Sequence, residues 1–190
     1  MTEERELISR AQRGERDAFQ ALVEQHKRNV FFLALDLSGN RQDAEDLSQD
    51  VFIRAFRYLK NFRGDAKFSS WLYRITVNCY LDSRRKKQML TVSFNEALSE
   101  ENYSADRSLK NSHASSPENE IQASDLQTHI RRALAQLSPR ERSVFVLRHY
   151  QEMPLKEIAA ALDIAEGTVK SLLFRAIKRL QKALAWVNEE

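Results

Sequence analysis

The sequence is poor in the residues that make turns, cross-links and membrane spans. Its 190 residues include four glycines and three prolines, too few for the many turns of an all-β fold. A single cysteine, Cys79, excludes an intramolecular disulfide and a multi-cysteine zinc site. No apolar run approaches the ~18 residues that cross a bilayer, and the acidic N-terminus lacks the apolar stretch of a signal peptide. These absences predict a soluble cytoplasmic protein.

The residues that carry enzyme chemistry are equally scarce. The four histidines are dispersed without the spacing of metal ligands, at His26, His113, His129 and His149. No glycine-rich phosphate loop occurs, and Cys79 falls on the apolar side of a helical pattern, where a core thiol is expected. We therefore predict no catalytic site, metal, cofactor or small-molecule substrate.

Charge is plentiful in both signs but unevenly distributed. The 30 Lys and Arg residues only slightly outnumber the 27 Asp and Glu residues, for a formal net charge of +3. Segments 62–87 and 167–188 each carry a net charge of +5, whereas 88–119 carries −3. Two basic concentrations are typical of a protein that binds a polyanion in two places. Two solvated helix faces would give the same counts.

The spacing of apolar residues predicts two helical modules. In 41–79 and again in 126–147 apolar residues recur every three or four positions, and no segment alternates like a strand. The stretch from Leu90 to Pro117 holds seven serines and too few apolar residues for a core. We expect an all-α protein with two small helical domains, at 1–88 and 118–190, joined by a flexible acidic linker at 89–117.

The most specific motif is a helix-turn-helix between Leu155 and Phe174. Such a motif needs apolar residues where two short helices meet and a small residue where they approach closely. Ala159 is the small residue, and the apolar positions are Ile158, Leu162, Ile164, Val169 and Leu172. Asp163 stands where glycine is common, since the turn requires a positive φ. Upstream, Ser138-Pro139-Arg140-Glu141 has the pattern of a capping box that begins a helix.

The second helix of this motif is basic and has the composition of a recognition helix. Its outward positions combine cations, which bind guanine edges and phosphates, with hydroxyls. They are Thr168, Lys170, Ser171, Phe174, Arg175 and Lys178. An ordinary helical hairpin with a solvated basic face is the alternative, and an aromatic at the position of Phe174 is more often part of a core. The length of the match favours DNA binding.

Segment 62–87 interleaves aromatic residues with cations. Aromatic rings stack on unpaired bases while Arg and Lys hold phosphates, so the composition suits single-stranded nucleic acid. Phe68 and Trp71 are better explained as core residues, whereas Phe62, in a predicted loop, is the better candidate for a base contact.

An acidic stripe precedes this segment on a predicted helix. Asp43, Asp46 and Asp50 share one face, which we expect to lie opposite the apolar residues Leu47, Val51 and Ala55. Because an acidic stripe repels DNA, it suits a basic protein surface, or it is simply a solvated face.

These motifs together resemble the extracytoplasmic-function (ECF) sigma factors, small two-domain initiation factors of bacterial transcription. Residues 43–52 are similar to the family's docking segment for the clamp helices of RNA polymerase. Residues 62–78 are similar to its promoter −10 reading loop and helix, and 138–171 to its −35 reading domain. The resemblance covers nearly the whole chain apart from the linker.

The resemblance implies roles for individual residues. Polymerase docking would use Asp43, Asp46, Asp50, Leu47, Gln49 and Phe52. The −10 contacts would be Phe62, Arg63, Lys67, Arg74, Asn78, Arg84 and Arg85, with Phe62, Lys67 and Asn78 cradling a flipped base. The −35 contacts would be Arg148, Thr168, Lys170, Ser171, Phe174, Arg175 and Lys178, with Arg148 and Thr168 positioning the DNA backbone.

The resemblance also implies partners: bacterial core RNA polymerase, promoter DNA and an anti-sigma factor, which is often membrane-anchored in this family. A stand-alone helix-turn-helix regulator of duplex DNA is the second interpretation. Such a regulator needs neither the acidic stripe nor segment 62–78, so these two features separate the two interpretations.

Overall fold

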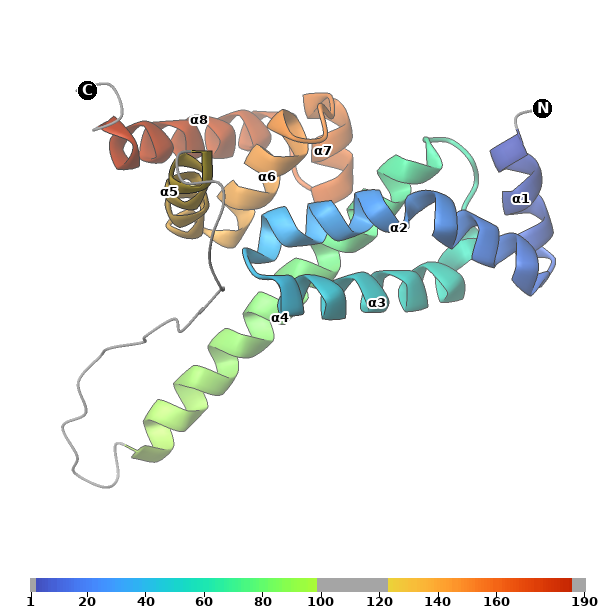
Figure 1. The fold of residues 1–190 in the computed structure, drawn as a ribbon, viewed down its shortest axis with the longest axis horizontal. Coiled ribbons are helices and arrows are strands. Elements are labelled where there is room, and N and C mark those ends of the chain that lie inside the picture. The colour runs from blue at the N-terminus through green and yellow to red at the C-terminus, as the bar shows by residue number, and fades with distance from the viewer. Residues whose placement is uncertain (1–2, 99–122, 186–190) are drawn as a thin grey trace.

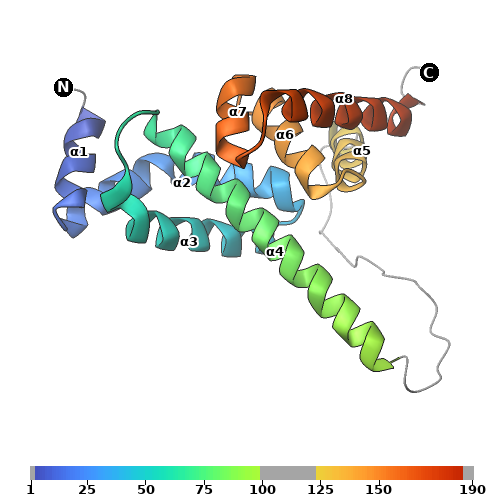
Figure 2. The ribbon, with the colours of Figure 1, turned by 180° about the vertical axis from the view of Figure 1, so that it is seen from behind.

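A computed structural model describes residues 3–98 and 123–185, and every α-helix in those ranges is shown in Figures 1 and 2. The N-terminal module consists of α1 (Glu3–Gln12), α2 (Arg16–Ser38), α3 (Arg41–Tyr58), the 3₁₀ turn η1 (Leu59–Asn61) and α4 (Phe68–Leu98). The C-terminal module consists of α5 (Ala123–Ala135), α6 (Pro139–His149), α7 (Leu155–Leu162) and α8 (Glu166–Ala183). The all-α prediction is confirmed.

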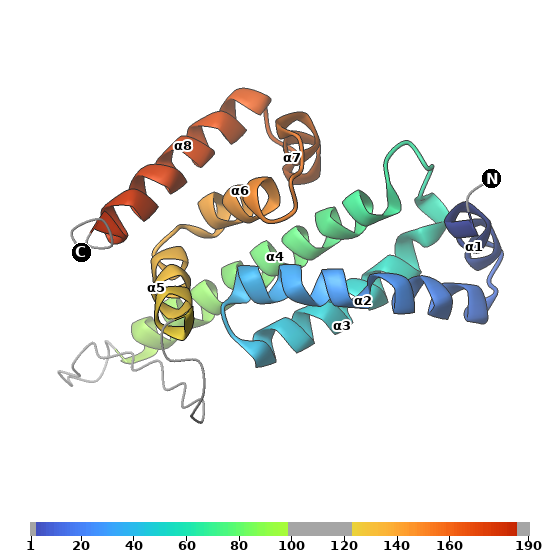
Figure 3. The same cartoon turned by 45° about the horizontal axis from the view of Figure 1, so that its top comes forward.

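The connection between α2 and α3 is only two residues long. Gly39 follows α2 with a left-handed φ of 84°, a conformation that costs glycine little. Asn40 then caps α3, because its side-chain oxygen accepts a hydrogen bond from the Asp43 amide at 2.8 Å. The hairpin packs on α4 (Figure 3), around a core that includes Leu22, Val30, Leu33, Leu37, Val51 and Leu72.

Helix α4 is longer than the sequence pattern indicates. Composition places the start of a linker at residue 89, whereas the helix continues to Leu98 and projects beyond the other helices (Figures 1 and 2). The run of Arg, Lys and Gln at 84–88 has high helix propensity, so the helix propagates past the core. The serine-rich remainder of the predicted linker lies outside the described residues.

Helix α6 of the C-terminal module begins where the sequence predicts. The Ser138 side chain accepts from the Glu141 amide at 3.3 Å, and the Glu141 carboxylate accepts from the Ser138 amide at 3.0 Å, so the capping box is confirmed. Asp163 has a φ of 54° in the turn between α7 and α8, which confirms its role in the helix-turn-helix. Ile158 and Val169 are buried where these two helices meet.

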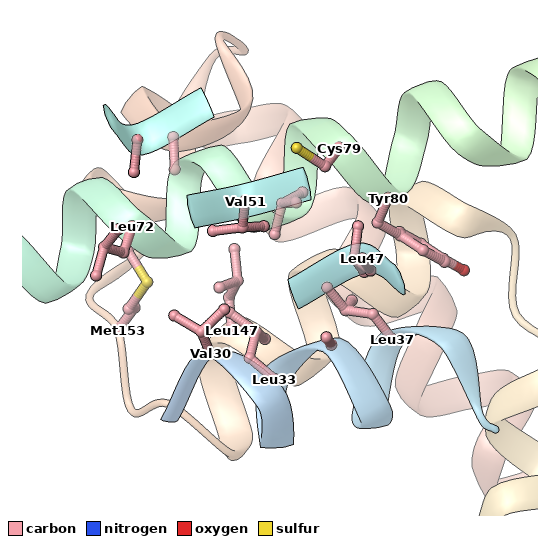
Figure 4. Packing of buried hydrophobic residues seen from close by; sticks show 14 of the residues in the cluster. Val30, Leu33, Leu37, Leu47, Val51, Leu72, Cys79, Tyr80, Leu147 and Met153 are labelled. Carbon is pink, nitrogen blue, oxygen red and sulfur yellow. The ribbon is translucent and has the colours of Figure 1, made fainter. Parts of the chain in front are cut away.

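The two modules share one hydrophobic core. Helices α6 and α7 pack on α2 and α4 (Figure 3), although these helices lie far apart in the sequence. Figure 4 shows Leu147 and Met153 of the C-terminal module in the same cluster as Val30, Leu33 and Leu72 of the N-terminal module. The pattern of the sequence predicts both modules but contains no signal for this contact.

Candidate nucleic-acid interfaces

Helix α8 separates an apolar face from a basic one. Val169 and Leu172 are buried with residues of α6 and α7, and Ala176 is buried with residues of α5. The six outward residues of the predicted recognition face are exposed, and Phe174, at 67% exposure, lies in solvent rather than in the core. This face can therefore enter a DNA groove without unfolding the module.

A buried carboxylate fixes α8 on α6. Glu141 is only 2% exposed, and in addition to capping α6 it accepts a hydrogen bond from Arg179 at 3.0 Å. Arg175, one turn earlier, lies 3.9 Å from the other carboxylate oxygen. Sequence reasoning identifies Glu141 only as a capping residue, because nothing in the spacing of the motif relates α6 to the far end of α8.

Arg148, the other predicted −35 residue outside α8, is exposed at the end of α6. Its guanidinium donates a hydrogen bond to the Met153 carbonyl at 3.1 Å. Arg148 thereby holds the loop between α6 and α7 in place. The predicted contact with a DNA phosphate would be a second role of this residue.

Phe62, the first residue of the predicted −10 loop, belongs to an aromatic cluster. The ring centroid of Phe62 lies 5.5 Å from that of Phe68 and 5.2 Å from that of Trp71. Phe68 is 3% exposed, which agrees with its assignment to the core, while Phe62 and Trp71 are half-buried. From α1, the Gln12 amide donates to the Phe62 carbonyl at 2.8 Å. This anchor of the loop has no signal in the sequence.

The polar residues predicted for the −10 element form an exposed row along α4. Lys67, at the start of the helix, is followed by Arg74, Asn78 and Arg85 at intervals of seven, four and seven residues, which repeat one helical face. All four are exposed, as is Arg63 in the preceding loop. Arg84 is also exposed, but it lies off this row and lines a crevice between α3 and α4.

That crevice, of about 160 Å³, also contains the acidic stripe of α3. Both carboxylate oxygens of Asp43 lie 3.0 Å from the Lys87 amine. Partial burial would raise the pKa of Asp43, but hydrogen bonds from Asn40 and Lys87 hold it below its ordinary value. The negative charge of the stripe is therefore partly neutralised by the basic residues of α4.

The predicted docking set of α3 divides between core and surface. Leu47 is 7% exposed and lies beside Asp43, one helical turn away, rather than opposite the stripe. Leu47 packs in the core and also lines the crevice, so its role in docking stays a prediction. Gln49 and Phe52 line a groove of about 520 Å³ between α2 and α3, with Val23 and Phe31 opposite.

Other chemistry is limited among the described residues. Cys79 is buried, and burial raises the pKa of its thiol to about 11, which opposes nucleophilic reactivity. Within 3–98 and 123–185, no cluster of His, Cys, Asp or Glu could hold a metal ion. No helix in the same ranges is long and apolar enough to span a bilayer.

Comparison with known proteins matches both modules to one family. The family model for Sigma-70 region 2 matches residues 22–89, and that for Sigma-70, region 4 matches residues 128–180. The chain is 34% identical to the ECF RNA polymerase sigma factor SigW of Bacillus subtilis, over 93% of this chain and 94% of the relative. The chain belongs to the ECF sigma factor family.

Other ECF-type relatives agree. Identity is 32% with the RNA polymerase sigma-H factor of Pseudomonas aeruginosa, over 96% of this chain and 94% of that protein. Identity is 35% with the ECF RNA polymerase sigma-E factor of Escherichia coli, over 90% of this chain and 88% of that protein. As an ECF sigma factor, the chain is a transcription initiation factor that binds core RNA polymerase and promoter DNA.

Two solved structures share the fold. One is the sigma factor RpoE in complex with the anti-sigma factor NepR from Bartonella quintana, with a TM-score of 0.62 and 24% identity over 88% of this chain and 96% of that chain. The other is CnrH in complex with the cytosolic domain of CnrY, with a TM-score of 0.65 and 24% identity over 96% of this chain and 97% of that chain.

Proposed function

We propose that this ECF sigma factor directs core RNA polymerase to its promoters through three surfaces. The N-terminal module docks on polymerase through α3 and reads the −10 element through the 62–67 loop and α4. The C-terminal module reads the −35 element through α8. One observation carries the proposal: both basic faces, on α4 and α8, are exposed while the apolar sides of the same helices are buried.

At the −35 element, the exposed side chains of α8 supply both kinds of contact that groove binding requires. Lys170 and Arg175 donate to base edges or phosphates, and Ser171 and Thr168 add hydroxyl groups. Glu141 holds α8 in a fixed rotation on α6, so that these side chains point away from the module.

At the −10 element, the geometry suits unpaired bases. Phe62 is half-buried at the edge of an aromatic cluster, which supports its ring while one side remains accessible. Lys67, which directly precedes α4, and Asn78 on α4 are both exposed, and the Asn78 amide can both donate to and accept from a base edge. Arg74 and Arg85 extend this face along the strand's phosphates.

For polymerase docking, the exposed members of the α3 set are the candidates. Asp46 and Asp50 are exposed on the crevice side, whereas Gln49 and Phe52 line the groove on the other side. A basic surface of polymerase would be attracted to the first, and an apolar side chain would fit the second.

We further infer control by an anti-sigma factor that masks polymerase-binding surfaces. This inference is supported by the sigma factor RpoE, which has the same fold and was solved in complex with the anti-sigma factor NepR.

Reconstituted run-off transcription tests the proposed function. Core polymerase that receives this protein should initiate from a defined start on a cognate promoter, and core alone should not. Transcripts that are unchanged by the protein across a genomic promoter library would contradict the proposal. The same assay with a purified anti-sigma candidate should show a dose-dependent loss of transcript.

A further inference from the structure

Helix α1 carries none of the residues assigned to DNA or polymerase, yet it holds the loop proposed to read the −10 element. It packs beside η1 (Figure 2). Its last residue, Gln12, is half-buried, and Nε2 of this side chain donates to the Leu59 carbonyl at 3.0 Å and to the Phe62 carbonyl at 2.8 Å. A glutamine amide has two N–H donors, so both are used on one short turn.

The turn that Gln12 holds is the start of the loop. The Phe62 amide donates to the Leu59 carbonyl at 3.0 Å, which closes the turn, and Gln12 binds the carbonyls at both of its ends. Residues 63–67 beyond it are exposed, and a Cβ atom at Gly64 would meet nothing within 4 Å. The two hydrogen bonds of Gln12 therefore fix Phe62 at the point where the packed part of the chain ends.

The far end of the loop also rests on α1. Phe68, the first residue of α4, is buried, and its ring centroid lies 5.2 Å from that of His26 on α2 in an edge-to-face arrangement. Nε2 of His26 lies 2.9 Å from Oε1 of Glu4 on α1. Helix α1 thus reaches one end of the loop directly, through Gln12, and the other through His26.

The corner between α1 and α2 keeps Gln12 in place. Gly14 allows this corner with a φ of 98°, and Arg10 pairs with Glu15 across it at 2.8 Å. Ala11, which directly precedes Gln12, is buried in the core of the module. The amide of Gln12 therefore extends from a fixed backbone, as a side chain that orients a functional group must.

We propose that Gln12 is a positioning residue for −10 recognition, and that it acts through Phe62. Stacking on an aromatic ring tolerates any base, so selectivity depends on the ring holding the base in one place against the Asn78 amide. By fixing the backbone of Phe62, Gln12 fixes where the half-buried ring presents its accessible side. This inference rests on the proposed function.

A change that removes both donors tests this role. Gln12→Met keeps the length of the side chain but has no N–H group, and Gln25→Met makes the same change at an exposed position of α2 outside the proposed DNA and docking surfaces. Run-off transcription with core polymerase would use a cognate promoter, a −10 mutant and a −35 mutant. The ratio of cognate to −10-mutant transcript should fall at least about threefold for Gln12→Met. The −35 ratio, and both ratios of Gln25→Met, should not change.

These ratios distinguish positioning from a merely structural role. A variant that folds less completely loses transcript from all three templates by the same factor, which leaves both ratios unchanged. A second comparison uses a Phe62→Ala background, in which Gln12→Met should lower the −10 ratio no further, because Gln12 acts through the ring that is already absent.

Hydrogen exchange in the free chain tests the two hydrogen bonds without polymerase. The Phe62 amide donates to a carbonyl that Gln12 also binds, so Gln12→Met should raise its exchange rate several-fold, whereas Gln25→Met should not. Circular dichroism checks helix content. Gln12→Glu, which directs an acceptor at the same two carbonyls, replaces Gln12→Met if that variant loses helix.

The outcomes separate this proposal from the proposed function. An unchanged −10 ratio, an equal loss of transcript from all three templates, or an unchanged exchange rate at Phe62 would overturn the positioning role of Gln12. So would a further fall of the −10 ratio in the Phe62→Ala background. Failure of the wild-type protein to direct transcription would instead count against the proposed function, while the exchange rates would still report on the hydrogen bonds of Gln12.

Discussion

The two basic segments carry the same net charge but present it differently. In α8 the cations lie on one exposed face, and the carboxylate that pairs with Arg175 and Arg179 is buried beneath them. In α4 the cations divide: Arg74 and Arg85 face solvent, whereas Arg84 and Lys87 border the acidic crevice of α3. Net charge therefore locates a nucleic-acid surface only roughly, and helical phase decides which cations reach the ligand.

The largest expected effect comes from removing the carboxylate beneath α8. Glu141→Ala removes the capping carboxylate of α6 and leaves Arg179 without its ion-pair partner. We expect this variant to have a free energy of unfolding about 2 kcal/mol lower than that of the wild type. Chemical denaturation measures this. The matched control is Glu166→Ala, which removes an exposed partner of Lys170 and should cost less than about 0.5 kcal/mol. Equal effects would show that the Glu141 network does not hold α8.

The outward face of α8 should matter more for recognition than for stability, since Arg179 still pairs with Glu141 when Arg175 is removed. Lys170→Ala with Arg175→Ala should lower affinity for a −35 element by at least about 30-fold, because each of the two base or phosphate contacts contributes about 1–3 kcal/mol. Footprinting with promoter mutants measures it. A double variant that still discriminates −35 mutants from the wild-type promoter would place the reading surface elsewhere.

These two residues also illustrate what sequence can predict. Outward and inward positions of α8, the capping box at Ser138 and the positive φ of Asp163 all follow from local spacing, and the structure confirms them. Local rules suffice there because each feature depends on residues within a few positions of one another.

Features that depend on distant segments could not be predicted in this way. The burial of Leu47 is decided by packing against other helices, which its motif does not reveal. The contact of Arg142 with the end of α2 joins residues 106 positions apart and has no periodic signature. The continuation of α4 to Leu98 shows that a serine-rich composition marks the start of a linker imprecisely.

Reversing one charge on α3 should sharpen the distinction between docking and DNA-reading surfaces. Asp46 is exposed, so Asp46→Arg should leave the fold intact while weakening binding to core polymerase about tenfold. A pull-down with core enzyme measures retention. Glu24→Arg, which makes the same change of charge at an exposed position of α2, is the control. Unchanged retention of the Asp46 variant would remove the stripe from the docking surface.

The division of cations on α4 predicts a difference between adjacent arginines. Arg85→Ala should weaken promoter binding by the holoenzyme several-fold and reduce its salt dependence by about one counterion. Arg84→Ala should have a smaller effect, because Arg84 borders the acidic crevice. Titrations at several salt concentrations measure both. Equal losses would mean that helical phase on α4 does not determine DNA contact.

The smallest expected effect is a pH dependence at the contact between modules. Burial raises the pKa of Asp36 to about 6, against the opposing influence of Arg142 and Arg131, and Tyr150 also lies nearby. Because this folded value exceeds that of an unfolded aspartate, the protonated carboxyl favours the folded state. Its contribution is fully present below the unfolded pKa and is lost as pH rises through about 6.

Asp36→Asn isolates this group from the other carboxylates. Relative to the variant, the wild-type free energy of unfolding should fall between pH 4 and pH 6.5, as measured by denaturant titration. A difference that stays constant across this range would show that Asp36 is not perturbed in the folded protein.

The central claim is that this chain recognises promoters as a subunit of RNA polymerase. Its most direct test is equilibrium binding to a cognate promoter fragment and a scrambled fragment, with and without core polymerase. We predict discrimination between the fragments only when core is present. Tight, sequence-specific binding by the isolated chain would contradict the account and favour a stand-alone helix-turn-helix regulator.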